Sequence, residues 1–220
     1  MGSGGLVKAV YVAPVSTPLT LDEAIDRMRQ GIHVATGEPP SNTALALALA
    51  KTALETGRWK SMWNWNWGNI KAGESFDGMY TCITLNEVLN GKTVWFAPGG
   101  QLDRKGGDVT GLAWAVPPGH PQTRMRAYAN GYDGAQEYVS FVADGRYADA
   151  WARLLEGDAV GYVHALKLKG YFTADEATYA RGVQSLFREF ALRIEERTPT
   201  DPAPPLDPND EPTKPDLDVA

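Results

Sequence analysis

The chain has 220 residues, 43% of them hydrophobic, which is enough for one well-packed domain without requiring a second. Its formal net charge of −6 argues against a nucleic-acid partner or an anionic membrane surface, because both are bound mainly through clustered Lys and Arg. Cys82 is the single cysteine, which excludes an intrachain disulfide.

The N-terminal region carries neither the basic segment nor the apolar segment of a signal peptide, and the chain has no apolar run long enough to cross a membrane. We expect residues 1–19 to form an extended arm that ends in prolines. Thr20 and Glu23 have the spacing of a capping box, which predicts a helix from residue 20 to about 30, with Gly31 as its stop.

Residues 41–57 predict a helix at the centre of the fold. Ser41 or Asn42 would cap it and Gly57 would end it. Up to Lys51 this helix carries no charge on any face, which is typical of a buried helix. Glu55 lies at its end, and four tryptophans follow within twelve residues: Trp59, Trp63, Trp65 and Trp67.

Two β-prone runs follow, at residues 79–84 and 92–97. Residues 85–91 join them, and Asn90-Gly91 is a strong signal for a hairpin turn. Residues 98–123 are rich in Gly and Pro, and a loop of that length is usually functional or mobile.

Helices are predicted again at residues 133–143, 146–155, 158–169 and 175–195. Asp158 and Thr173 are the expected caps, and Gly157 and Gly170 the expected stops. Residues 198–220 are rich in Pro and Asp with little apolar mass, which predicts a disordered tail. The remaining domain would therefore span residues 20–197.

Four short motifs occur in an order that resembles the bacterial glucosaminidase family of the lysozyme superfamily. This family includes flagellar-type peptidoglycan hydrolases and enzymes like mannosyl-glycoprotein endo-β-N-acetylglucosaminidase. The motifs are Ala53-Leu-Glu55-Thr-Gly57, Asn66-Trp-Gly-Asn-Ile-Lys71, Met125-Arg-Ala-Tyr128 and Gly170-Tyr-Phe-Thr173. The resemblance implies an α+β, lysozyme-like fold, in which a mainly helical body and a small β-hairpin lobe enclose a cleft.

Glu55 matches the position of the family's catalytic acid. The bland alternative is an exposed glutamate on the last turn of a helix. The negative end of the helix dipole and nearby indoles would both favour the protonated carboxyl, which a glycosidase needs in order to protonate its leaving oxygen. We expect Glu55 to be the general acid.

A second carboxylate is usual in glycosidases. Glu87 is the first candidate because it lies on the predicted hairpin, and a solvated hairpin residue is the competing interpretation. Glu74 and Asp77 are further candidates. Substrate assistance by an N-acetyl group, which the resemblance also allows, would remove the need for a second carboxylate.

The remaining site predictions concern sugar binding. Trp63 or Trp65 would form a platform for a sugar ring, and Trp67 would be structural. Asn66 and Asn69 would fix their turn by Asx hydrogen bonds or contact an N-acetyl group. Tyr128 and Tyr171 match positions that line the family's cleft, with core packing as the alternative for Tyr171.

No metal-ligand or phosphate-loop spacing occurs, so we expect neither a metal nor another cofactor. The predicted function is cleavage of a β-1,4 bond in peptidoglycan, with the N-acetylglucosaminidase reaction favoured. A muramidase, a lytic transglycosylase and a non-catalytic glycan-binding module are the alternatives. With no signal peptide, the protein would reach the cell wall by lysis, a phage tail or an injection system.

Overall fold

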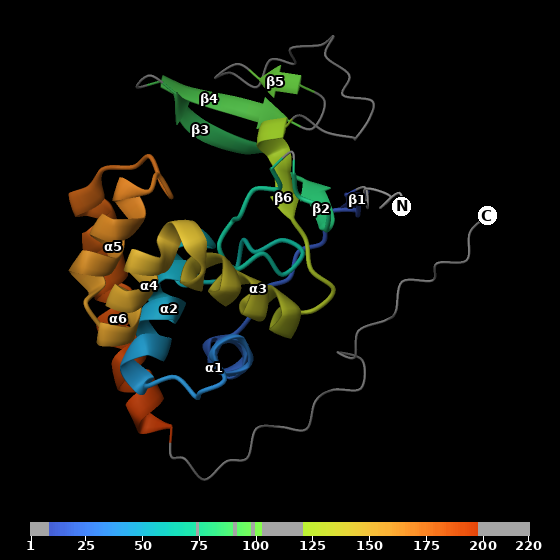
Figure 1. The fold of residues 1–220 in the computed structure, drawn as a ribbon. Helices are drawn as coiled ribbons and strands as arrows, with labels where there is room; N and C mark the ends of the chain where they lie inside the picture. The colour runs from blue at the N-terminus through green and yellow to red at the C-terminus, as the bar shows by residue number, and fades with distance from the viewer. Residues whose placement is uncertain (1–8, 74, 90–91, 98–99, 103–120, 198–220) are drawn as a thin grey trace, which may run out of the picture.

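The computed structural model describes residues 9–73, 75–89, 92–97, 100–102 and 121–197. Within them a helical body lies beside two small sheets, as Figure 1 shows. The helices are α1 (Leu21–Thr36), α2 (Asn42–Glu55), α3 (Gly131–Ala143), α4 (Ala148–Glu156), α5 (Ala159–Leu168) and α6 (Glu176–Glu196). Two 3₁₀ turns, η1 (Pro121–Thr123) and η2 (Gly145–Tyr147), complete the helical elements.

Helix α2 runs through the body and is buried from Ala44 to Ala53. It packs against α6, α1 and α4, so its neighbours cover it on several sides. Ser41 caps it by accepting a hydrogen bond from the Ala44 backbone N–H at 3.1 Å. The prediction of a buried central helix is confirmed, and Glu55 is its last residue.

Helix α1 is longer than predicted, because Gly31 does not end it. The helix continues to Thr36, and Gly37 closes it in the left-handed conformation. Gly31 is instead buried where α1 crosses α3, and a Cβ at this position would lie 2.8 Å from the carbonyl carbon of Ala135. The glycine therefore permits close helix packing rather than a helix stop.

The strands form two three-stranded sheets, ordered β1-β2-β6 and β3-β4-β5. Their bounds are β1 Val10–Tyr11, β2 Met79–Cys82, β3 Leu85–Leu89, β4 Lys92–Ala97, β5 Gly100–Leu102 and β6 Arg124–Arg126. Strand β2 pairs in parallel with β1 and antiparallel with β6. The segment that precedes α1 is therefore joined to this sheet through β1.

The hairpin exists with a different first strand from the one predicted. The partner of β4 is β3, in the register Glu87 to Val94, whereas residues 79–82 belong to the other sheet. The predicted turn at Asn90-Gly91, most of the 98–123 loop and the 198–220 tail lie outside the described residues.

The caps of the later helices agree with the predictions except at α6. Asp158 caps α5 by accepting from the Gly161 N–H at 2.9 Å. Helix α6 is capped by Asp175 and not by Thr173, because the Asp175 carboxylate accepts from both the backbone N–H and the hydroxyl of Thr178.

Candidate active site

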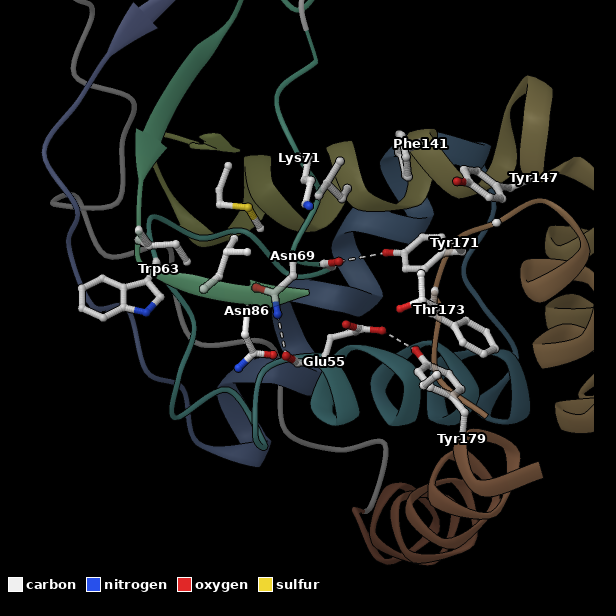
Figure 2. Close-up of a pocket in the computed structure, with 18 of the residues that line it drawn as sticks. Glu55, Trp63, Asn69, Lys71, Asn86, Phe141, Tyr147, Tyr171, Thr173 and Tyr179 are labelled. Atoms are coloured by element: carbon white, nitrogen blue, oxygen red, sulfur yellow. Dashed lines mark hydrogen bonds between the residues drawn. The ribbon is translucent and has the colours of Figure 1, made fainter. Parts of the chain in front are cut away.

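A pocket of about 740 Å³ opens beside the C-terminal end of α2. Its lining comes mainly from the end of α2, the 61–71 segment, strand β3 and the α5–α6 connection, with further residues from β6, α3, η2 and α6. Figure 2 shows Glu55 among these residues, with Trp63 and Tyr147 at opposite ends. A size of 300–1,000 Å³ is typical of small-molecule and glycan sites.

Glu55 is held in the pocket by two hydrogen bonds. The Asn69 side-chain amide donates to the Glu55 backbone carbonyl, and the Tyr179 hydroxyl donates to Glu55 Oε1, as drawn in Figure 2. The Glu55 side chain is 19% exposed. Within the described part of the chain nothing donates a hydrogen bond to Oε2, so this oxygen is available to a ligand.

Lys51 lies one helical turn before Glu55 and is fully buried, with 0% of its side chain exposed. Its ammonium Nζ is 3.8 Å from Glu55 Oε1 and 3.6 Å from the centroid of the Tyr171 ring. Among the residues that the structure describes, Nζ has no hydrogen-bond partner. Burial lowers the pKa of Lys51 to about 8, although the charge of Glu55 acts in the opposite direction.

Four tyrosines surround this pair, of which Tyr138 and Tyr162 are buried and Tyr171 and Tyr179 are partly buried. Burial raises the pKa of Tyr171 and Tyr179 well above the usual value, and the charge of Glu55 raises both further. Tyr138 and Tyr162 share a 3.1 Å hydrogen bond between their hydroxyls, and burial raises the pKa of each. These phenols therefore stay neutral near neutral pH, and they supply hydrogen bonds and ring faces rather than charge.

The segment between α2 and β2 reaches the pocket through an unusual backbone. Arg58, Trp59, Asn64, Trp65 and Asn69 all have positive φ, a conformation that non-glycine residues rarely adopt. Such strain persists only where surrounding contacts enforce it. The segment's side chains and its neighbours supply those contacts.

Asn66 is buried and provides several of the contacts that fix this segment. Its Oδ1 accepts from the Ile70 N–H at 2.8 Å, and its Nδ2 donates to the carbonyls of Ile70 and Arg126. The predicted turn-fixing role of Asn66 agrees with these bonds. The amide is thereby occupied by backbone and is absent from the pocket lining.

Three of the predicted sugar-binding residues line the pocket: Trp63, Asn69 and Tyr171. Trp65 lies elsewhere, because its ring packs on the helical core and against the Arg27 guanidinium at 5.6 Å. Tyr128 is also outside the lining, and burial raises its pKa to about 12. We therefore assign Trp65 and Tyr128 to packing.

We expected indoles near the Glu55 carboxyl, and for Trp59 and Trp67 this prediction is wrong. Trp59 and Trp67 are buried in the core, where Trp59 stacks on Phe190 and donates its indole N–H to Thr52. The Trp67 indole donates to the Gly131 carbonyl, as expected for a structural residue. Tyrosines and Lys51 take the place beside the carboxyl that we expected indoles to fill.

The second carboxylate is not identified. Among the described lining residues Glu55 is the only acid, and Asp77 is exposed outside the pocket. The backbone of Glu87 lies in β3, next to a pocket residue, Asn86. The Glu87 side chain and all of Glu74 lie outside the described residues.

Sequence reasoning missed Lys51 and Tyr179. Lys51 had a recognisable signal, since it is the only charge in an otherwise apolar helix before Glu55 and sits at i−4 from it. Tyr179 had none, because the contact spans 124 residues and depends on how α6 packs on α2. Asn86 of β3 was also missed, because residues 85–91 were predicted to be the connection of the hairpin and not its first strand.

Within the described ranges, no helix combines the length and apolar character required to span a bilayer. The same ranges contain no group of three or more His, Cys, Asp or Glu side chains that could hold a metal.

No family model matches the chain, and no curated protein matches it in sequence. Two solved structures resemble it. A mutant peptidoglycan hydrolase from Sphingomonas sp. A1 superposes with a TM-score of 0.55 and 21% identity, over 80% of this chain and 99% of that one.

A C-terminally truncated glycoside hydrolase domain of Salmonella typhimurium FlgJ superposes with a TM-score of 0.45 and 20% identity. That match covers 81% of this chain and 100% of the other. The predicted α+β, mainly helical fold is confirmed, and this chain shares it with the Sphingomonas peptidoglycan hydrolase.

Proposed function

We propose that this protein is a peptidoglycan hydrolase that cleaves a β-1,4 glycosidic bond of the glycan strand, with Glu55 as general acid. The single observation that carries the proposal is Glu55 itself, whose backbone carbonyl is held by Asn69 and whose carboxyl is held by Tyr179 inside a pocket of about 740 Å³. The shared fold with a peptidoglycan hydrolase supports the same substrate class.

The chemistry asked of Glu55 is proton donation to the leaving oxygen. Tyr179 and Lys51 both lie at Oε1, so the proton to be donated resides on Oε2. As the glycosidic C–O bond breaks, that proton moves to the departing oxygen and Glu55 is left as a carboxylate. Water then supplies the hydroxyl that the anomeric carbon gains, and its remaining proton restores the Glu55 acid. The Tyr179 hydroxyl can then stabilise the new charge at Oε1.

Sugar binding rests on the uncharged and aromatic residues of the lining. Trp63 offers an indole at one end of the pocket, Tyr147 and Tyr171 lie toward the other, and Phe172 is a further aromatic residue of the lining. Asn86 and Asn69 add amide groups that suit hydroxyl and N-acetyl groups. The lining includes two cations, Lys71 and Arg146, which suit the carboxylates of a peptide stem.

The N-acetylglucosaminidase reaction is the version we favour, on the motifs around Glu55, Tyr128 and Tyr171. Muramidase and lytic transglycosylase activities differ in the bond cut and in the product formed. Mass spectrometry of the released fragments distinguishes them, because the reducing-end sugar differs and a transglycosylase leaves an anhydro end.

The test is turbidity clearing of purified sacculi by the wild-type protein and by Glu55→Gln, which removes the acid proton and keeps the amide of similar shape. Clearing by the wild type and loss of at least about 100-fold in the variant are expected. Equal clearing by the two proteins would exclude Glu55 as the acid. Binding to sacculi without clearing would identify a non-catalytic module instead.

A further inference from the structure

Burying Lys51 in α2 is unfavourable to the folding free energy, and the fold alone does not explain why a lysine occupies this position. A charged side chain is almost never fully buried unless it is paired and hydrogen-bonded. Lys51 has 0% side-chain exposure, and no described residue accepts a hydrogen bond from its Nζ. An Ala or Leu would fit the apolar pattern of the rest of α2, so the charge itself requires an explanation.

The position of the charge points to Glu55. Nζ lies 3.8 Å from Oε1, the same oxygen to which the Tyr179 hydroxyl donates. Nζ also lies 3.6 Å from the centroid of the Tyr171 ring and 5.3 Å from that of the Tyr138 ring. Lys51 itself does not line the pocket, so it acts on a substrate through the residues it contacts, and among these contacts Glu55 is the carboxyl that donates the proton.

We propose that Lys51 is a positioning residue that strengthens Glu55 as an acid, by stabilising the carboxylate that remains when Glu55 gives up its proton. This inference rests on the proposed function, in which that proton goes to the leaving oxygen as the glycosidic C–O bond breaks. The Lys51 ammonium keeps its own protons, and it supplies only the favourable charge.

Of the described groups around Glu55 and Lys51, Lys51 is the one that brings a charge to the Glu55 carboxyl. Tyr138 of α3, Tyr162 of α5, Tyr171 of the α5–α6 connection and Tyr179 of α6 are neutral near neutral pH, because burial raises the pKa of each. Lys71 and Arg146, the cations that line the pocket, have no ion pair with Glu55 in the described residues. A charge 3.8 Å away in a buried site is screened little by solvent.

The charge of Lys51 also disappears over an accessible pH range. Burial brings its pKa to about 8, so the ammonium is present at and below neutral pH and is lost above it. While it is present, it stabilises the carboxylate that proton donation leaves on Glu55, because Nζ lies 3.8 Å from Oε1.

The first test compares Lys51→Met with Lys60→Met. Methionine has nearly the shape of lysine without its charge, and exposed Lys60 provides the same change in net charge away from the pair. Rates on solubilised glycan strands are measured against pH. For Lys51→Met we expect about a tenfold lower maximal kcat and an alkaline limb about one pH unit higher, with KM unchanged.

The proposal would be overturned if the pH–rate profiles of Lys51→Met and Lys60→Met fell at the same alkaline pH. A lysine with only a structural role would change the rate without moving the pH–rate profile. Circular dichroism verifies that both variants fold, and Lys51→Gln replaces Lys51→Met if methionine disturbs the packing.

The second test does not depend on activity, so it separates failure of this inference from failure of the proposed function. The titration of the Lys51 side chain is followed by NMR in the wild type and in Glu55→Gln. Loss of the carboxylate should lower the Lys51 midpoint below its wild-type value, since Glu55 raises the pKa of Lys51. Identical midpoints would overturn the proposed pair even in an active enzyme. A lowered midpoint in a protein that clears no sacculi would leave the pair established and the hydrolase function wrong.

Discussion

The Tyr171 hydroxyl donates a 2.9 Å hydrogen bond to the carbonyl of Gly68, and so joins the α5–α6 connection to the strained segment after α2. The approach is close enough that a Cβ on Gly68 would lie 2.7 Å from that hydroxyl. Asn69, which holds the Glu55 backbone, is the next residue. This bond therefore fixes one wall of the pocket with respect to the acid.

Tyr171→Phe should destabilise the protein and reduce its activity. The variant keeps the ring beside Lys51 but leaves the Gly68 carbonyl without its donor, which costs about 1–2 kcal/mol. Urea denaturation measures the loss. Tyr147→Phe is the matched control, since no hydrogen bond of the Tyr147 hydroxyl is found among the described residues and the residue lies in the same pocket. Equal midpoints for both variants would show that the Tyr171 bond contributes nothing.

Tyr179→Phe should lower kcat with little effect on KM. The lost hydroxyl donates to Glu55 Oε1, so its removal frees the carboxyl to rotate and leaves the carboxylate formed in the reaction with one fewer donor. About a 10- to 100-fold loss is expected, because a hydrogen bond to a charged group is worth about 1.5–3 kcal/mol. Steady-state kinetics on solubilised glycan strands provides the measurement. A rise in KM at constant kcat would instead place Tyr179 in substrate binding.

The helices are the part of the fold that a single sequence predicts well. Their starts depend on short polar side chains that satisfy free backbone N–H groups, as Thr20, Ser41 and Asp158 do here. The burial of α2 follows from its apolar sequence, which is interrupted by a single charge before Glu55, and that burial places Glu55 at the edge of the core. Local chemistry therefore accounts for the position of the proposed acid.

What surrounds Glu55 was not predictable, because it depends on contacts between distant segments. Tyr179 reaches the acid only through the packing of α6 on α2. Trp65 and Tyr128 have the residue type and spacing of ligand-binding aromatics, and tertiary packing directs both away from the pocket. Gly31 was mistaken for a helix stop because its reason, the crossing of α1 and α3, is not local.

Gly31→Ala should destabilise the fold by about 1–3 kcal/mol, the usual cost of overpacking. The added Cβ would meet the carbonyl carbon of Ala135 at 2.8 Å, and helix backbone cannot move aside as a flexible side chain could. Gly73→Ala is the control, because a Cβ there meets nothing within 4 Å and the backbone is not left-handed. Thermal unfolding compares the two, and a Gly31→Ala protein as stable as Gly73→Ala would contradict the close crossing.

Lys51→Met should stabilise the fold near neutral pH while it impairs the enzyme. The pKa of Lys51 is about 8 in the folded protein and about 10.5 in the unfolded chain, so between these values the unfolded chain binds one more proton. The wild-type free energy of unfolding should therefore rise with pH across this window and be lower by about 3 kcal/mol below it.

In Lys51→Met this rise should be absent, and the gain in stability over the wild type should be present at pH 7 and largely gone above pH 10.5. Urea denaturation at several pH values measures it, with Lys60→Met as the control that keeps the wild-type slope. A Lys51→Met protein no more stable than the wild type at pH 7 would show that the buried ammonium has little cost. A more stable but slower variant is the expected result for a charge retained for catalysis at the expense of the fold.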